Sequence, residues 1–78
     1  MNSNRDLQLR AFGAAVRSLR KELGLSQEEL AHRCELDRTY IGGVERGERN
    51  VSLLNIHAIA KALEIAVSDL MVASERVA

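Results

Sequence analysis

Three consecutive side chains with hydrogen-bonding tips, Arg38, Thr39 and Tyr40, stand at the start of a segment that is predicted to form a short helix, residues 38–46. An Arg guanidinium has the right shape for two parallel hydrogen bonds to guanine O6 and N7, and the hydroxyls of Thr and Tyr can contact base edges or phosphate. These residue types are therefore suited to contacts with base edges in the major groove of a duplex.

The rest of that predicted helix leaves room for such contacts. Ile41 and Val44 are three positions apart and are predicted to face the core. The opposite face then carries Arg38, Gly42 and either Glu45 or Arg46. Gly42 would let the helix backbone approach a duplex closely, whereas Gly43 is expected to allow tight helix packing. Two glycines inside a helix cost about 1 kcal/mol each relative to Ala, so a local requirement should offset them.

Capping residues define this helix and the one before it. Ser26 and Glu29 have the spacing of a capping box, in which the Ser hydroxyl accepts from the Glu amide and the Glu carboxylate accepts from the Ser amide. Asp37 is a suitable N-cap for the next helix. The predicted helices, 27–34 and 38–46, are joined by a very short turn, so they must cross steeply, as in a helix-turn-helix.

A longer helix is expected before this pair, from Arg5 or Asp6 to Leu23, with Gly24 ending it in the left-handed conformation. Its apolar stripe has spacings of three and four and consists of Leu9, Phe12, Val16, Leu19 and Leu23. Its other side is basic and carries Arg10, Arg17, Arg20 and Lys21. This basic side could contact phosphate or could simply be solvated. Solvation is the favoured alternative for its residues other than Arg17 and Arg20.

Two helices are predicted to follow the helix-turn-helix. Ser52 caps a helix that runs to about Leu63 and buries Leu53 or Leu54, and Ser68 caps a short fifth helix. The apolar side chains at this end of the chain exceed what two short helices can bury, which is typical of an interface. The residues predicted to form a two-fold dimer interface are Ile65, Val67, Leu70 and Met71. The alternative is that these side chains close the core of the monomer.

Composition indicates a small all-α protein. Of 78 residues, 46% are hydrophobic, 3% are aromatic and none is proline. We expect one domain over residues 1–78 with an aliphatic core, and frayed ends at residues 1–4 and 74–78. No apolar run could span a bilayer and the N-terminus lacks a signal-peptide core, which favours a cytoplasmic, nucleoid-associated bacterial protein. A single Cys34 fits a reducing compartment.

The sequence lacks the patterns expected of an enzyme or of a metal site. There is no carboxylate pair, nucleophile–base arrangement or phosphate-binding loop. His32 and His57 are far apart in the sequence and have no further ligand at metal spacing. Cys34 is expected to be a buried small hydrophobe and not a nucleophile. We therefore predict no catalytic activity, no cofactor and no metal.

The charge balance argues against strong non-specific binding to nucleic acid. Eleven basic residues balance eleven acidic ones, for a net charge of zero. Many DNA-binding domains are basic, because neutralising phosphates and releasing counterions supplies most of their non-specific affinity. The acidic residues here concentrate at helix N-termini, where they complement the helix dipole. Specificity would then come from base contacts and from paired subunits.

The segment from Gln27 to Asn50 resembles the phage-repressor-like helix-turn-helix family. The matching residues are Gln27 at the start of the second helix, Ala31 at its middle, Ile41 and Val44 facing inward, and Glu45, Arg46 and Gly47. Within that family, LDRTYIGGVERGERN is most similar to the controller proteins of bacterial restriction-modification systems. The resemblance implies an all-α, five-helix lambda-repressor-like domain with the helix-turn-helix at helices 2 and 3. One departure is Glu35, where the family often has Gly or Asn; a positive φ there would cost about 1 kcal/mol.

The resemblance also implies a function. The hypothesis is a homodimeric transcriptional regulator that binds palindromic operators in double-stranded DNA and controls a restriction-modification operon, with RNA polymerase as a further candidate partner. The matching glutamine commonly contacts the sugar–phosphate backbone in the family, and Arg49 with Asn50 would lie against the flanking groove. The predicted DNA contacts are Gln27, Arg38, Thr39, Tyr40, Gly42, Arg46, Arg49 and Asn50. A prophage-type repressor and an antitoxin-like protein-interaction module are the alternatives.

Overall fold

The computed structural model describes residues 3–77, and this range contains five α-helices and no strand. The prediction of an all-α fold with five helices is confirmed. The helices are α1 (Asn4–Glu22), α2 (Gln27–Cys34), α3 (Arg38–Glu45), α4 (Leu53–Ala62) and α5 (Val67–Glu75). None of them is long and apolar enough to cross a membrane.

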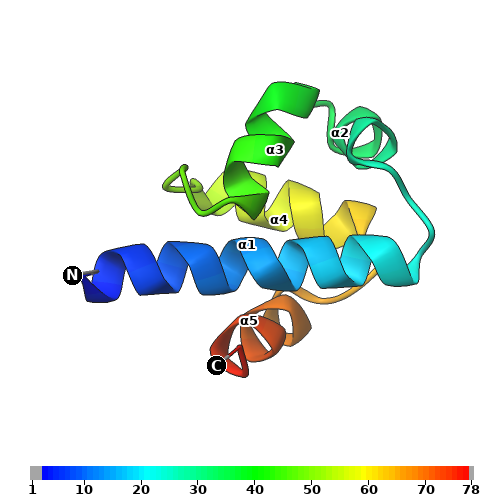
Figure 1. Cartoon of the computed structure of the whole chain (residues 1–78). Helices are drawn as coiled ribbons and strands as arrows, with labels where there is room; N and C mark the ends of the chain where they lie inside the picture. The colour runs from blue at the N-terminus through cyan, green and yellow to red at the C-terminus, as the bar shows by residue number, and fades with distance from the viewer. Residues whose placement is uncertain (1–2, 78) are drawn as a thin grey trace.

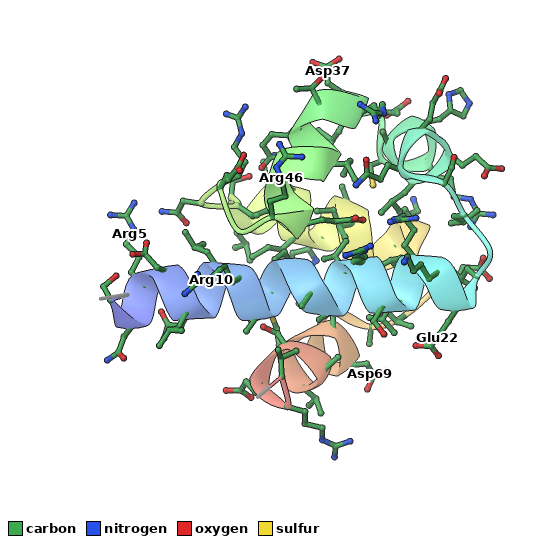
Figure 2. All side chains as sticks on the ribbon, viewed as in Figure 1. Arg5, Arg10, Glu22, Asp37, Arg46 and Asp69 are labelled. Carbon is green, nitrogen blue, oxygen red and sulfur yellow. The ribbon has the colours of Figure 1, made fainter. Side chains whose placement is uncertain are left out.

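The long helix α1 is the axis of the domain, and the other helices pack on two sides of it (Figure 1). It contacts α3 on one side and α5 on the other, while α2 packs against α3 and α4. Helix α3 rises from α1 at a steep angle, so its C-terminal end lies near α1 and its N-terminal end points away. Figure 2 shows Asp37 at that far end. The helix-turn-helix therefore presents the start of α3 at the edge of the molecule.

The core is aliphatic apart from Phe12, close to what the composition predicts. Ile41 and Val44 on α3 are buried, which confirms the predicted inward face of that helix. The largest fully buried side chains come from all five helices and are Leu30, Ile41, Ile59, Leu70, Val16 and Val44. Burying each such side chain contributes about 1.5–3 kcal/mol of transfer free energy.

Gly13 sets the close approach of α1 and α3. A Cβ at this position would overlap the carbonyl oxygen of Val44 and lie 2.6 Å from that of Glu45. Any side chain at residue 13 would therefore push the two helices apart. The hydrophobic pattern of α1 does not reveal this requirement, because Gly13 lies beside the apolar stripe and not on it.

The cap predictions for α2, α3 and α4 place the helix starts correctly. Ser26 forms the full capping box with Glu29, with hydrogen bonds of 3.0 and 2.9 Å. The backbone N–H of Ser26 lowers the pKa of the Glu29 carboxyl by donating to it. Ser52 accepts from the Asn55 amide at 3.2 Å. Asp37 occupies the N-cap of α3, but its side chain makes no capping hydrogen bond.

Helices extend into both segments that are predicted to fray, residues 1–4 and 74–78, and the fraying itself stays a prediction. Ser3 caps α1 by accepting from the Asp6 amide, so the helix already begins at Asn4. Helix α5 has Ala66, not Ser68, at its N-cap and continues through Glu75. Residues 1, 2 and 78 lie outside the described range.

Helices α1 to α4 end in the same way. In each, a residue with positive φ follows the last helical turn, and the next amide donates back to a carbonyl five residues earlier, which is a Schellman motif. The residues with positive φ are Gly24, Glu35, Gly47 and Glu64. The four back-donating amides are those of Leu25, Leu36, Glu48 and Ile65. Two of the four positions thus carry a glutamate in a conformation that favours glycine.

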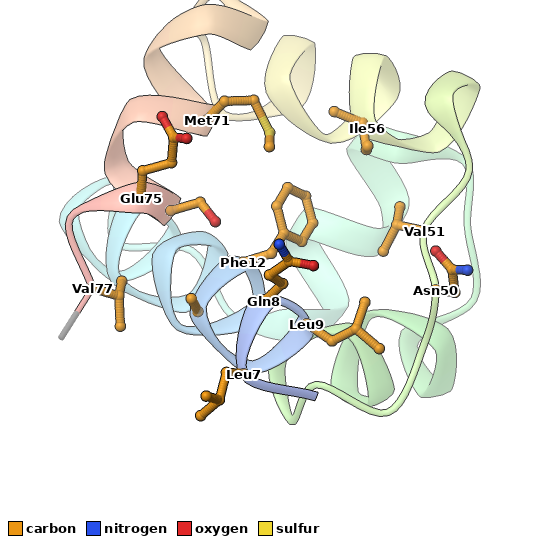
Figure 3. Close-up of a pocket in the computed structure, with 12 residues that line it drawn as sticks. Leu7, Gln8, Leu9, Phe12, Asn50, Val51, Ile56, Met71, Glu75 and Val77 are labelled. Carbon is orange, nitrogen blue, oxygen red and sulfur yellow. The ribbon is translucent and has the colours of Figure 1, made fainter. Parts of the chain in front are cut away.

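The predicted burial of Leu53 or Leu54 is wrong for both residues. Their exposed fractions are 67% and 81%, at the first turn of α4. Close to this turn lies an apolar pocket of about 550 Å³ between α1, the chain before α4, and α5. Figure 3 shows Phe12 in this pocket between Met71 and Val51. The apolar surplus of the chain is therefore real, but it is exposed at the start of α4.

The strained helix ends allow a stability test. Glu35→Gly should raise the free energy of unfolding by about 0.5–1 kcal/mol, because Gly adopts the left-handed conformation without Cβ strain. Gly24→Ala should lower it by about 1 kcal/mol, since a Cβ there meets no atom within 4 Å and backbone strain is its main cost. Urea unfolding measures both changes. A Glu35→Gly variant no more stable than the natural chain would contradict this account.

Candidate nucleic-acid interface

The exposed part of α3 is its N-terminal turn. Arg38 and Thr39 are exposed and Tyr40 is half-buried, whereas every residue from Ile41 to Glu45 is buried. The predicted base-reading residues therefore lie at the end of α3 that points away from α1 (Figure 2). Their contact with bases stays a prediction.

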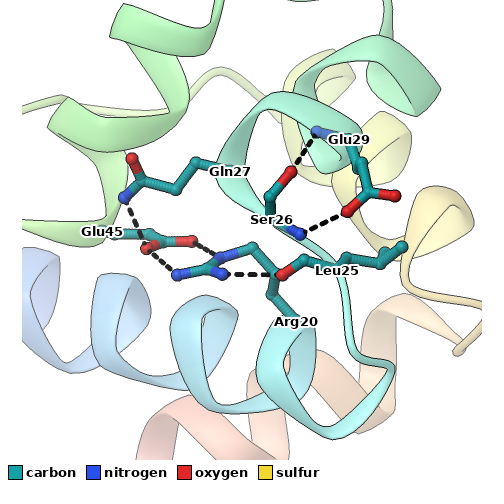
Figure 4. A network of polar contacts seen from close by, with 6 residues as sticks. All are labelled: Arg20, Leu25, Ser26, Gln27, Glu29 and Glu45. Atoms are coloured by element: carbon teal, nitrogen blue, oxygen red, sulfur yellow. Dashed lines mark hydrogen bonds and ion pairs between the residues drawn. The ribbon is translucent and has the colours of Figure 1, made fainter.

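Glu45 and Arg46 are the two candidates for the outer face, and the structure shows that Arg46 is exposed whereas Glu45 is buried. Its side chain is 2% exposed and pairs with Arg20 of α1, whose side chain is 9% exposed. Arg20 Nε donates to Glu45 Oε2 at 2.7 Å and Nη2 donates to Oε1 at 3.0 Å (Figure 4). This two-point contact raises the pKa of Arg20, against the desolvation that lowers it.

Two further contacts extend the pair into a network that joins three elements. Arg20 Nη1 donates to the carbonyl oxygen of Leu25, just before α2, at 2.8 Å. Gln27 Nε2, at the start of α2, donates to Glu45 Oε1 at 2.9 Å. Arg20 is therefore a structural residue, and neither alternative left open for the basic side of α1, phosphate contact or solvation, applies to it. The network fixes the start of α2 and the end of α3 against α1.

Gln27 lies where α2 meets α3. Its Nε2 is engaged by Glu45, and its Oε1 lies 3.6 Å from the position that a Cβ of Gly42 would take. The side chain is half-buried, so it is partly open to solvent. Its predicted contact with the sugar–phosphate backbone stays a prediction, and the network would hold it in place for that contact.

The two glycines of α3 have roles that differ from those predicted. A Cβ at Gly42 would lie 3.1 Å from Arg46 Nη1, so the Arg46 side chain covers this part of the helix. A Cβ at Gly43 would lie 3.1 Å from Arg49 Nε and 3.2 Å from its Cγ. Gly42 is thus not open to direct approach, and Gly43 does not serve helix packing. Each glycine instead makes space for an arginine, which is the local requirement that offsets its helix cost.

Arg49 and Tyr40 are held together beside α3. The Arg49 guanidinium carbon lies 5.8 Å from the centre of the Tyr40 ring, which is a cation–π distance. Asn55 Nδ2 of α4 donates to the Tyr40 hydroxyl at 3.1 Å. The sequence did not identify Asn55, because only the fold brings the start of α4 beside α3. Asn50 is exposed in the loop before α4.

Arg46 is exposed and makes an ion pair on the surface. Its Nε donates to Glu48 Oε2 at 3.0 Å and its Nη2 donates to Glu48 Oε1 at 3.1 Å. The hydrogen bond with Glu48 raises the pKa of Arg46, and the same contact lowers the pKa of Glu48. The structure thus gathers Gln27, Gly42 and Arg46 in one group and Tyr40 and Arg49 in another, while Arg38 and Thr39 extend beyond both.

The predicted dimer residues do not form one exposed set. Leu70 is 0% exposed and belongs to the monomer core, so its selection is wrong. Ile65 and Val67 are half-buried against the core, and Met71 is exposed. The error arises because α5 begins at Val67 and turns Leu70 toward α1 and α4.

Two further kinds of site, a metal site and a reactive thiol, have little support among the side chains that the structure describes. Over residues 3–77, no group of three or more His, Cys, Asp or Glu side chains could hold a metal ion. Cys34 is buried, as predicted, and desolvation raises the pKa of its thiol. A thiol in such a setting is a weak nucleophile at neutral pH.

Comparison with known proteins identifies close relatives. A helix-turn-helix family model matches residues 16–70. The control protein C.BamHI of Bacillus amyloliquefaciens is 52% identical over 61 residues, which are 77% of this chain and 75% of that protein. The crystal structure of the restriction-modification controller protein C.AhdI from Aeromonas hydrophila is 56% identical, with a TM-score of 0.78 over 80% of this chain and 94% of that chain. A nucleoprotein complex of C.Esp1396I gives 33% identity and a TM-score of 0.81, covering 88% of this chain and 90% of that chain.

The buried network predicts a large effect on stability. Glu45→Ala should lower the free energy of unfolding by about 3–5 kcal/mol, because it leaves the Arg20 guanidinium buried without a counter-ion. The double variant Arg20→Met with Glu45→Leu should recover most of that loss, since apolar residues of similar volume remove both charges. Urea unfolding compares the variants. A loss below about 1 kcal/mol for Glu45→Ala, the usual value of a surface pair, would contradict a structural role.

Proposed function

The chain belongs to the helix-turn-helix family, and from this premise we propose that it is a sequence-specific DNA-binding transcriptional regulator of the restriction-modification controller type. The observation that carries this function is the exposed N-terminal turn of α3, where Arg38 and Thr39 project at the edge of the molecule while the other end of α3 is fixed to α1 and α2. A rigid helix with free donors at its tip is what contact with base edges in the major groove requires.

The contacts divide into base and backbone contacts by position. Arg38 would bind a base edge, with Thr39 and Tyr40 beside it. Gln27 at the start of α2 would bind phosphate, because the free amides and the positive end of the helix dipole favour an anion there. Arg46, which lies near Gln27 beside Gly42, would also contact the backbone, and Arg49 and Asn50 would contact the backbone of the flanking groove. Gly42 would act indirectly, by making space for Arg46.

A homodimer would give the domain two such surfaces. Leu53 and Leu54 are the most exposed large apolar side chains among the described residues. Ile56, one turn after Leu53, and Met71 line the nearby apolar pocket (Figure 3). We propose that the two-fold interface lies on this surface of α4 and α5 and that the buried Leu70 is not part of it. Pairing there would present two α3 helices to a palindromic operator, whose half-sites lie about one helical turn of DNA apart.

The control of a restriction-modification operon, a cytoplasmic and nucleoid-associated location, and a contact with RNA polymerase are further parts of the proposal. They rest on likeness to the named controller proteins and on no feature of the interface itself. A prophage-type repressor would use the same surface. An antitoxin-like protein-interaction module is favoured by the zero net charge alone. Selection of bound sequences from a random DNA pool distinguishes a DNA-binding regulator from a protein-interaction module, because the module enriches no operator.

Single arginine substitutions test the division of contacts. Arg38→Ala should weaken operator binding by about 1–3 kcal/mol and relax the preference at one base pair, whereas Arg49→Ala should weaken binding to all sequences and reduce the salt slope by about one. Fluorescence anisotropy with the selected operator and its single-base variants measures both effects. Equal losses on every base variant for Arg38→Ala would show that Arg38 contacts phosphate.

A charge placed among the exposed leucines tests the dimer. Leu54→Glu should convert the protein to a monomer in sedimentation equilibrium, because two copies of the carboxylate would be desolvated at the two-fold interface. Ala14→Glu, which adds the same charge to the exposed side of α1, should leave the association unchanged. If Leu54→Glu associates as strongly as the natural chain, the interface lies elsewhere.

A further inference from the structure

Glu48 places an anion on the surface that is proposed to meet DNA. Its two carboxylate oxygens accept from Nε and Nη2 of Arg46, at 3.0 and 3.1 Å. This side of the guanidinium is one that a phosphate would use, because phosphate also accepts two parallel N–H donors. The carboxylate therefore occupies the site on Arg46 that a DNA backbone would require.

Both partners of this pair are held where they are by α3. The backbone N–H of Glu48 donates to the Gly43 carbonyl at 2.9 Å in the motif that ends the helix, and Gly47 with φ +75° directs the chain into that position. The Arg46 side chain lies across Gly42. The contact is thus built into the end of the helix, yet both side chains remain open to solvent, with exposed fractions of 59% and 58%.

We propose that Glu48 is an internal competitor for DNA phosphate, which holds Arg46 in the free protein and must be displaced when the backbone binds. This inference rests on the proposed DNA-binding function and adds a residue that limits the affinity. An exposed pair exchanges readily, because water and salt screen its attraction. Displacement therefore does not prevent binding, but it weakens every complex in which Arg46 contacts phosphate.

The competitor has a distinct effect on salt dependence. A cationic side chain that neutralises a phosphate releases a condensed counterion from DNA. A displaced Glu48 carboxylate takes up a cation from solution, which cancels part of that release. The salt slope of binding should thus be smaller than the number of arginines at the interface implies. Non-specific binding depends almost entirely on this electrostatic contribution, so Glu48 should keep it low.

Glu48→Gln tests the proposal, with binding measured on a random-sequence duplex and on the selected operator at about 50–200 mM salt. We expect affinity for the random duplex to rise about two- to fivefold, the range for one surface ion pair, and the salt slope to steepen by up to about one. Glu64→Gln is the matched control, since it removes the same charge from another exposed pair, with Arg33 at 3.0 Å, outside α3 and its following loop.

Arg46→Ala, alone and combined with Glu48→Gln, shows whether the effect of Glu48→Gln on DNA affinity depends on the ion pair between Arg46 and Glu48. If Glu48→Gln changes affinity only when Arg46 is present, and Glu64→Gln changes it less, the competitor role is supported. The role is overturned if Glu48→Gln has no effect or weakens binding, or if its gain persists without Arg46. A natural chain that enriches no operator and binds no duplex would overturn the proposed function as well, whereas the other outcomes leave that function intact.

Discussion

The buried contact between Arg20 and Glu45 is the constraint on which the rest of the structure depends. It joins the last turn of α1 to the last turn of α3, and Gln27 attaches the start of α2 to the same carboxylate. Two buried charges are costly to desolvate, so this contact adds less to stability than to geometry. Its geometry is specific because a guanidinium and a carboxylate match at two points. The angle at which α2 and α3 leave α1 is therefore set by hydrogen bonds as well as by apolar packing.

Fixing one end of α3 frees the other end for function. Gly13 lets the C-terminal half of α3 lie against the α1 backbone, and the buried network holds it there. The first turn of α3 then lies away from α1 at the edge of the domain (Figure 1). A helix held in this way presents its tip without a large loss of conformational entropy on binding. The buried Arg20–Glu45 ion pair and the exposed first turn of α3 are therefore linked, because the pair holds the helix that presents this turn.

Local signals in the sequence predicted the elements, and long-range contacts limited the prediction of the site. Ser26 and Glu29 act within a few residues, so the start of α2 was predicted correctly. Glu45 and Arg46 are alternatives for the outer face, yet at 100° per residue Glu45 lies only about 40° from Ile41 around the helix. Arg20 likewise follows Val16 by four positions on α1. Two opposite charges, each one turn from a core residue, were the available signal of a buried pair. The partners are 25 positions apart, so the pairing itself needed the fold.

The same arrangement explains how a chain of zero net charge can have an interface rich in arginine. Two acidic groups at the C-terminal end of α3 are engaged by specific cations: Glu45 by Arg20, and Glu48 by Arg46. Arg49 instead lies over the Tyr40 ring. The guanidinium groups of Arg20, Arg46 and Arg49 are thus held in place by carboxylates and an aromatic ring, whereas Arg38 is exposed at the tip of α3. Under the proposed function, such a surface would attract any duplex weakly, and affinity would come from a base sequence that forms contacts with the tip of α3. Neutral composition then serves specificity, because it lowers the electrostatic binding that all sequences share.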